Sequence, residues 1–144
     1  MSKSFYRAKS FLYIMKKRGI TNSEYAPILV RWGIALVFLW FGINQIINPD
    51  MFLGWMHVNM QFVQENEIVL IMIHGVGELI LGTLLILGLW TRVVATLLAI
   101  NLLGITVNLG YNDIAVRDVG LLLATVAIMM HGPDRWCLDS KKKD

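Results

Sequence analysis

His74 and Glu78 lie four residues apart within an apolar stretch, and their types suit acid–base chemistry. A spacing of four places both side chains on one face of a helix, where an imidazole can relay the proton of a carboxyl group. The stretch from Ile68 to Arg92 is long enough to cross a ~30 Å hydrocarbon core. Glu78 lies near its centre, where a carboxylate costs on the order of 3 kcal/mol. We therefore expect Glu78 to face protein or water, and to be protonated or tightly paired near neutral pH.

The other apolar stretches also carry polar residues, and depth along each helix predicts that these lie in the same half of a bundle. They are Asn44 and Gln45, Asn101 and Asn108, and the pair Arg117 and Asp118. With His74 and Glu78 they would form a column of polar groups. Reduction of a quinone needs hydrogen-bond donors to two carbonyl oxygens and a proton source. In this interpretation Glu78 and His74 are the catalytic proton carriers, and the ligand is held by Asn44, Asn101, Arg117 and Asp118.

A structural interpretation uses the same groups. Glu78 would bond Asn101 or His74, and Arg117 would pair with a carboxylate, so that the contacts only set the register of the helices. The protein would then be an accessory or structural component of a larger membrane complex. A transporter is a third possibility, which would need several copies to form a path. Arg31 has two predicted positions, at the lipid headgroups or turned inward toward Glu78.

The elements that must position these residues are membrane-spanning helices. The chain has 144 residues, of which 56% are hydrophobic and 16% charged, whereas about a quarter of the residues in a soluble domain are charged. We predict an all-α membrane protein, a four-helix up-down bundle over residues 26–132, with spans at about 27–47, 68–89, 93–109 and 114–130. A short interfacial helix carrying Phe52 and Trp55 is expected between the first two spans.

Charge predicts the orientation of the bundle. Lys and Arg gather in the N-terminal segment 1–25, at Arg92 in the turn between the second and third spans, and in the tail 133–144. The opposite side carries only Arg117. We therefore expect a multi-pass protein of the cell membrane with both termini in the cytoplasm, and the segment 1–25 on the lipid surface. The net charge of +3 comes mainly from the two ends, so it indicates membrane topology and not nucleic-acid binding.

The sequence also limits the cofactors. The chain has one cysteine, Cys137, and its three histidines are far apart, so we predict neither an internal disulfide nor a metal site. It carries no sequence signature for a flavin, a haem or an iron–sulfur cluster. The expected cofactor is therefore none in the chain itself, or a bound quinone, with electrons supplied by another protein. The expected partners are membrane lipid and either subunits of a larger complex or further copies of this chain.

Three stretches carry a resemblance to a known family: FLWFGINQIINP (38–49), GELILGTLLILGLWTR (77–92) and RDVGLLLATVAIMMHGPDRWCLD (117–139). In their content and order they resemble the DoxX family of small four-helix membrane proteins. Gln45 stands where members of that family often have a lysine. The resemblance implies a membrane subunit, in some members one that serves a sulfur-oxidising or quinone-linked oxidoreductase, and in others a small partner that joins soluble redox enzymes to the membrane.

Overall fold

The computed structural model describes residues 25–55 and 66–141. Its elements are α2 (Tyr25–Ile47), the 3-10 helix η1 (Pro49–Trp55), α4 (Glu67–Leu87), α5 (Thr91–Leu109), α6 (Asp113–His131) and the short α7 (Leu138–Lys141). The described residues contain no β-strand. The four long helices are each long and apolar enough to cross a membrane. They cover the four predicted spans, so the all-α four-helix fold is confirmed.

Large apolar side chains cover the outside of the helices. Leu29 on α2, Val107 on α5 and Leu123 on α6 are each exposed over about two thirds of their surface or more (69%, 72% and 65%). Such a surface is unfavourable in water and suits the hydrocarbon of a bilayer. The turns between the helices carry the expected signals. Gly88 ends α4 in the left-handed conformation, and Asn112 caps α6 by accepting the backbone N–H of Ala115 at 2.8 Å.

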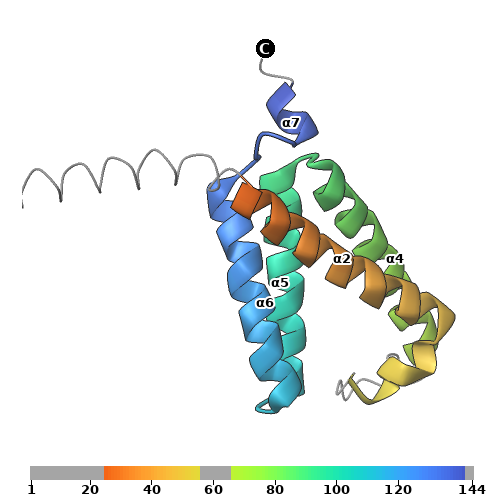
Figure 1. The fold of residues 1–144 in the computed structure, drawn as a ribbon. Coiled ribbons are helices and arrows are strands. Elements are labelled where there is room, and N and C mark those ends of the chain that lie inside the picture. Colours follow the sequence, from red (N-terminus) through yellow and green to blue (C-terminus); the bar gives the residue numbers. More distant parts are fainter. Residues whose placement is uncertain (1–24, 56–65, 142–144) are drawn as a thin grey trace, which may run out of the picture.

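The helices form two antiparallel pairs, α2 with α4 and α5 with α6 (Figure 1). Contacts are dense within each pair and sparse between them. The pairs lie close together at the end of the bundle that carries α7, and they diverge toward the end that carries η1 (Figure 1). The buried core lies in the α7 half, where Phe38, Leu85 and Leu98 belong to one cluster. The η1 half is left more open, and this is where a site can form.

Two glycines bring α2 and α4 into backbone contact. A Cβ atom on Gly42 would lie 2.7 Å from the carbonyl oxygen of Gly75, and one on Gly75 would lie 2.8 Å from Cβ of Gln45. Both distances are shorter than any side chain tolerates, so only glycine allows this crossing. Gln45 and Glu78 each follow one of these glycines by three residues, about one helical turn. The glycine contact therefore sets these two side chains opposite each other.

Arg31 holds the α7 end of the bundle together. Its guanidinium forms an ion pair with Asp134, with 2.7 Å between Nε and Oδ2, and Nη1 donates to the carbonyl oxygens of Leu85 and Ile86 at 2.6 and 2.5 Å. These carbonyls lie in the last turn of α4, where the regular helical donors run out, although the backbone N–H of Gly88 also donates to Leu85 at 3.2 Å. Arg31 is 1% exposed. Both predicted positions for Arg31 are therefore wrong, since its partner lies in the segment after α6.

The same C-terminal segment also caps α5. The backbone N–H of Thr91, the first residue of α5, donates to Oδ2 of Asp139 at 2.9 Å. The residue before it, Trp90, makes no side-chain capping bond. A carboxylate distant in sequence therefore accepts a free N–H at the start of this helix, and its negative charge interacts favourably with the positive end of the helix dipole. Cys137 is buried against Thr91. We refer to Asp134, Cys137, Asp139 and the groups they contact as the C-terminal clasp.

The expected interfacial helix is only partly within the described residues. Its first part is the 3-10 helix η1, and Phe52 on it is buried, with its ring 6.2 Å from the ring of Phe41 on α2. Phe52 therefore packs inward, whereas an interfacial helix would present it to lipid. The rest of that predicted helix lies outside the described residues, as does the basic segment 1–25 except for Tyr25.

Candidate functional site

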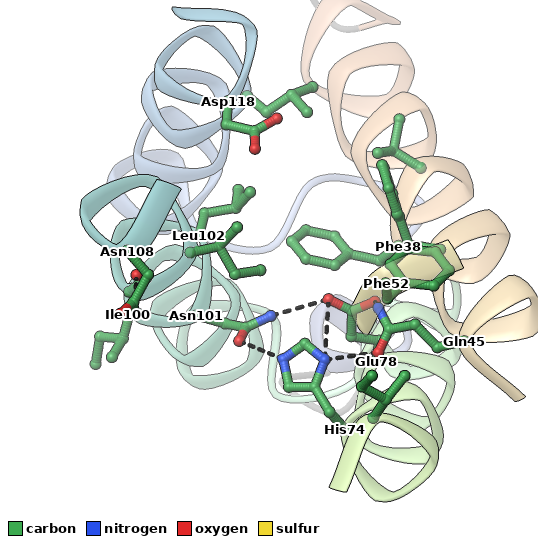
Figure 2. A pocket seen from close by; sticks show the side chains of 16 residues that line it. Phe38, Gln45, Phe52, His74, Glu78, Ile100, Asn101, Leu102, Asn108 and Asp118 are labelled. Atoms are coloured by element: carbon green, nitrogen blue, oxygen red, sulfur yellow. Dashed lines mark hydrogen bonds and ion pairs between the residues drawn. The ribbon is translucent and has the colours of Figure 1, made fainter. Parts of the chain in front are cut away.

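A cavity of about 380 Å³ lies in the η1 half of the bundle, between the two helix pairs. All four long helices and η1 contribute to its lining (Figure 2). Much of the wall is apolar and includes Phe38, Phe41, Phe52, Ile71, Ile100 and Leu121. Polar side chains occupy two sides of it. A volume of several hundred Å³ with mostly apolar walls and a few polar groups is typical of sites for small organic ligands.

The first polar side is a closed ring of four side chains from three helices. Gln45 Nε2 donates to Glu78 Oε2 at 2.9 Å, and Asn101 Nδ2 donates to Glu78 Oε1 at 3.0 Å. His74 Nδ1 lies 2.7 Å from Gln45 Oε1, and Nε2 lies 2.7 Å from Asn101 Oδ1. Figure 2 shows the imidazole between the two amides with the carboxyl group opposite it. We call these four residues the polar ring.

The sequence positions explain why the ring forms. His74 and Glu78 share one face of α4, and the Gly42–Gly75 contact brings Gln45 of α2 to that face. Asn101 comes from the middle of α5. Glu78 is 3% exposed, whereas the His74 side chain is 37% exposed and borders the cavity. The Glu78 carboxyl group is thus shielded from lipid, and hydrogen bonds through Gln45 and Asn101 connect it to His74 at the edge of the cavity.

The second polar side is Asp118 on α6, which points into the cavity across from the ring (Figure 2). It is 3% exposed, and its Oδ1 accepts hydrogen bonds from Nε and Nη2 of Arg117 at 3.0 and 2.9 Å. Arg117 itself is half-exposed and lies over the ring of Phe41, 5.6 Å from its centroid. The Arg117 guanidinium therefore stands outside the cavity and neutralises the carboxylate that lines it.

The structure brings together most of the predicted site residues. His74, Glu78, Asn101 and Asp118 all line the cavity, as does Asn108. Arg117 does not line the cavity itself, but its guanidinium donates hydrogen bonds to Asp118, which does. Asn44 does not line it, because its side-chain amide donates to the carbonyl oxygen of Trp40 on its own helix at 2.7 Å. The structure thus places Asn44 apart from the candidate site.

The sequence interpretation gave no part in the site to Gln45 or to the apolar wall residues, among them Phe52. Gln45 was expected in the polar column by depth but was given no part in binding, although it bonds both Glu78 and His74. Its spacing from Gly42, matched by that of Glu78 from Gly75, is the signal that would have identified it. Phe52 was expected to face lipid, so nothing in the sequence placed it on the cavity wall.

Chemically, the site combines an imidazole and a carboxyl group with amide hydrogen-bond donors beside an apolar space. Each amide nitrogen in the ring uses one of its two N–H groups on Glu78, and the second can donate to a ligand oxygen. Among the described residues no three His, Cys, Asp or Glu side chains are grouped as metal ligands would be.

Two comparisons with known proteins agree with this architecture. The profile of the family described as DoxX matches residues 26–110, from the start of the first span to the end of the third. The chain is also 30% identical over 131 residues to a protein of Mycobacterium tuberculosis (strain ATCC 25618 / H37Rv) described as "Uncharacterized membrane protein Rv3486", with 79% of each chain covered. No solved structure matches the chain significantly.

Proposed function

The chain belongs to the DoxX family of membrane proteins, and we propose that it is a membrane subunit that binds a lipid-soluble, quinone-like molecule in the cavity between its two helix pairs. The cavity is the observation that carries this proposal. A bundle whose polar groups served only to set its register has no need for an unfilled space of about 380 Å³ beside them. Such a space is enough for a substituted aromatic ring.

The chemistry of the walls favours a ring with two carbonyl groups. Gln45 and Asn101 offer N–H donors on one side of the cavity, beside the proton-carrying pair His74 and Glu78. The aromatic side chains Phe38, Phe41 and Phe52 suit the faces and edges of a flat ligand. Electrons for any reduction would come from a separate redox protein, because the sequence carries no signature of a redox cofactor.

An adjoining groove offers a route from the bilayer. It is lined by residues of α2 and α6 (Leu36, Val37, Trp40, Phe41, Arg117 and Leu121), and three of these, Val37, Phe41 and Leu121, also line the cavity. Leu36 and Trp40 are 60% and 56% exposed on the outer surface of the bundle. A lipid-soluble ligand would therefore enter sideways, past the shared wall. In the proposed orientation both termini are cytoplasmic, so the cavity lies in the outer half of the cell membrane.

A second candidate function is that of an accessory or structural subunit of a membrane complex with no ligand of its own. One observation favours it: among the described residues every buried side-chain nitrogen and oxygen has a hydrogen-bond partner. The polar ring is therefore satisfied without a ligand.

Binding of a short-chain quinone to the full chain in lipid nanodiscs separates these candidates. Gly104 lines the cavity and Gly120 does not, and a Cβ atom on either glycine meets nothing within 4 Å. Gly104→Leu should fill the cavity and weaken binding roughly tenfold or more, as expected for a displaced ligand group. Gly120→Leu is the matched control and should bind as the unmodified chain does. If the unmodified chain binds no quinone, or if Gly104→Leu binds as tightly, the ligand-binding proposal is wrong and the structural candidate stands.

A further inference from the structure

The hydrogen bonds of the polar ring determine how many protons it holds. Each of its four contacts joins one residue to the next, in the order His74, Gln45, Glu78, Asn101 and back to His74. A ring of four hydrogen bonds needs four donated hydrogens, one in each contact. The amides supply a fixed number of N–H groups and the carboxyl and imidazole groups supply a variable number. The count of protons can therefore be worked out from the contacts.

In the arrangement of Figure 2, both imidazole nitrogens of His74 face amide oxygens. An amide oxygen only accepts, so both nitrogens must carry a hydrogen, and His74 is then an imidazolium ion. The amide nitrogens of Gln45 and Asn101 both donate to Glu78, which is then an ionised carboxylate. The two charges are joined through the amides, while His74 Nδ1 and Glu78 Oε1 remain 3.9 Å apart. The ring as a whole is neutral.

A second arrangement satisfies the ring equally well. If the amide of Asn101 is reversed, its nitrogen donates to Nε2 of a neutral His74 and its oxygen accepts a hydrogen from a protonated Glu78. Relative to the first arrangement, one proton has left Nε2 of His74 and one has bonded to Oε1 of Glu78, so the number of protons is unchanged. Reversing Gln45 in place of Asn101 gives the mirror case.

Every other proton count breaks a contact. With a neutral His74 and an ionised Glu78, one imidazole nitrogen faces an oxygen with no hydrogen between them. With an imidazolium and a protonated carboxyl group, two donors face each other in one contact. Glu78 is 3% exposed and its bond with Gln45 is buried, while the other three contacts are part-buried, and an unmet contact away from bulk water is costly. Both departures are therefore disfavoured.

We propose that the polar ring is a proton-binding site that holds one ionisable proton, carried by His74 or, with one bridging amide reversed, by Glu78. This goes beyond ligand binding, since it follows from the four contacts whether or not the cavity is filled. The site takes up and releases this proton as a unit, and neither residue ionises independently of the other. A ligand that accepts the proton would leave the ring one hydrogen short, and the ring would regain it from water.

Few other charges face the ring among the residues that the structure describes. Across the cavity, α6 presents Asp118, which is paired with Arg117. The facing parts of α2 and α5 carry amides and apolar groups. On η1, Asp50 is exposed, and Glu67 lies in the first turn of α4. In the described part of the chain, Asp118 is thus the only carboxylate other than Glu78 that lines the cavity.

The test measures the protonation of both residues in the full chain in lipid bilayers. Nitrogen-15 magnetic resonance reports whether His74 is an imidazolium or neutral, and infrared spectroscopy reports whether Glu78 is protonated. N-acetylhistidine in the same buffer is the reference for an unconstrained imidazole. As the pH passes through about 6.5, where a free imidazole titrates, the ring should keep one proton: an imidazolium with a carboxylate, or a neutral imidazole with a protonated carboxyl group. A His74 that changes charge together with the reference imidazole, while Glu78 stays ionised, would overturn the proposal.

Two variants sharpen the result. Glu78→Gln resembles the protonated carboxyl group in shape and donors, so His74 should be neutral throughout the same pH range. Asp118→Asn removes the other carboxylate that lines the cavity and should leave the ring unchanged. If His74 is an imidazolium in Glu78→Gln, or if Asp118→Asn changes its protonation, one shared proton does not describe the site. The unmodified chain alone decides the matter if either variant fails to fold.

Discussion

Arg31, in the second turn of α2, and Asp134, beyond the end of α6, form a buried ion pair with 2.7 Å between Nε and Oδ2. The pair joins segments about a hundred residues apart, and the same guanidinium donates to the carbonyl oxygens of Leu85 and Ile86 in the last turn of α4. Three elements therefore meet on one side chain. Removing either charge leaves the other buried without its partner.

Loss of this ion pair should destabilise the bundle strongly. We expect Asp134→Asn to lower the free energy of unfolding by about 3–5 kcal/mol, because the Arg31 charge remains buried. The double variant Arg31→Met with Asp134→Leu removes both charges and should be more stable than Asp134→Asn alone. Thermal unfolding in a mild detergent measures both. Asp50→Asn is the control, since Asp50 on η1 is an exposed carboxylate and its loss should change stability little. Equal losses in the single and double variants would contradict a coupled pair.

The clasp also predicts how stability depends on pH. Burial alone would raise the pKa of Asp134, but hydrogen bonds from Arg31 and from the backbone N–H of Trp136, with the Arg31 charge, outweigh it and lower the pKa below its usual range. A lowered pKa in the folded state stabilises the protein above the pKa of the unfolded chain, about 3.9. This contribution should be complete at neutral pH and lost as the pH falls below about 4. The melting temperature of Asp134→Asn should lack this part of the acid dependence.

The Gly42–Gly75 contact predicts a clear difference between two glycines of α4. Gly75→Ala places a methyl group against α2 and should destabilise the protein by about 1–3 kcal/mol, and it should also separate Gln45 from Glu78. Gly77→Ala is the matched control, because its Cβ atom meets nothing within 4 Å. It should be neutral, or stabilising by up to about 1 kcal/mol from helix propensity. Comparable melting temperatures for the two variants would show that α2 and α4 do not cross so closely.

The proposed orientation is tested by labelling cysteines in intact cells with a reagent that cannot cross the membrane. Tyr111 lies in the turn between α5 and α6 and is 99% exposed, so Tyr111→Cys should be labelled. Lys142→Cys in the tail should not be labelled. Labelling at 142 with none at 111 would reverse the orientation and place the cavity in the cytoplasmic half.

The native cysteine should not interfere with this experiment. Burial raises the pKa of the Cys137 thiol, and the hydrogen bond from Thr91 only partly offsets this. The thiolate is the reactive form, so Cys137 should react slowly at neutral pH. We expect the unmodified chain to take up no label in opened cells until it is unfolded. Rapid labelling of the folded chain would mean that the C-terminal clasp opens readily.

The sequence predicted the depth of the site residues better than the direction in which they point. Each residue advances about 1.5 Å along a helix, so Glu78 and Asn101 were expected in the same half of the bundle, where they bond each other. Direction turns by about 100° per residue, and a small difference in helix rotation decides which of two neighbours faces inward. Asn44 and Gln45 are adjacent, yet Gln45 joins the ring and Asn44 bonds its own helix. The crossing at Gly42 and Gly75 selects between them, and it belongs to the packing of two helices.

Arg31 shows the other limit of the sequence analysis. Its partner Asp134 lies past the end of α6, in a segment expected only as a basic tail. The turn at Gly132 and Pro133 directs the chain back toward α2, and the Asp139 cap on α5 holds it there. Hydropathy predicts the membrane spans, but it carries no information about a C-terminal segment that folds back onto the bundle. The ends of the helices were thus predicted, while the contacts that hold those ends together were not.

The groove beside the cavity has a consequence for how a ligand's affinity should be expressed. Because the groove faces the surface that lipid covers, a ligand that enters by it is drawn from the solution of that molecule in the membrane. Occupancy then follows the mole fraction of ligand in the lipid, and the concentration in water matters only through the partition coefficient. A strongly lipid-soluble compound could thus fill a site of modest intrinsic affinity. Lengthening its hydrocarbon tail would raise apparent binding measured per volume of water, and leave binding measured per lipid almost unchanged.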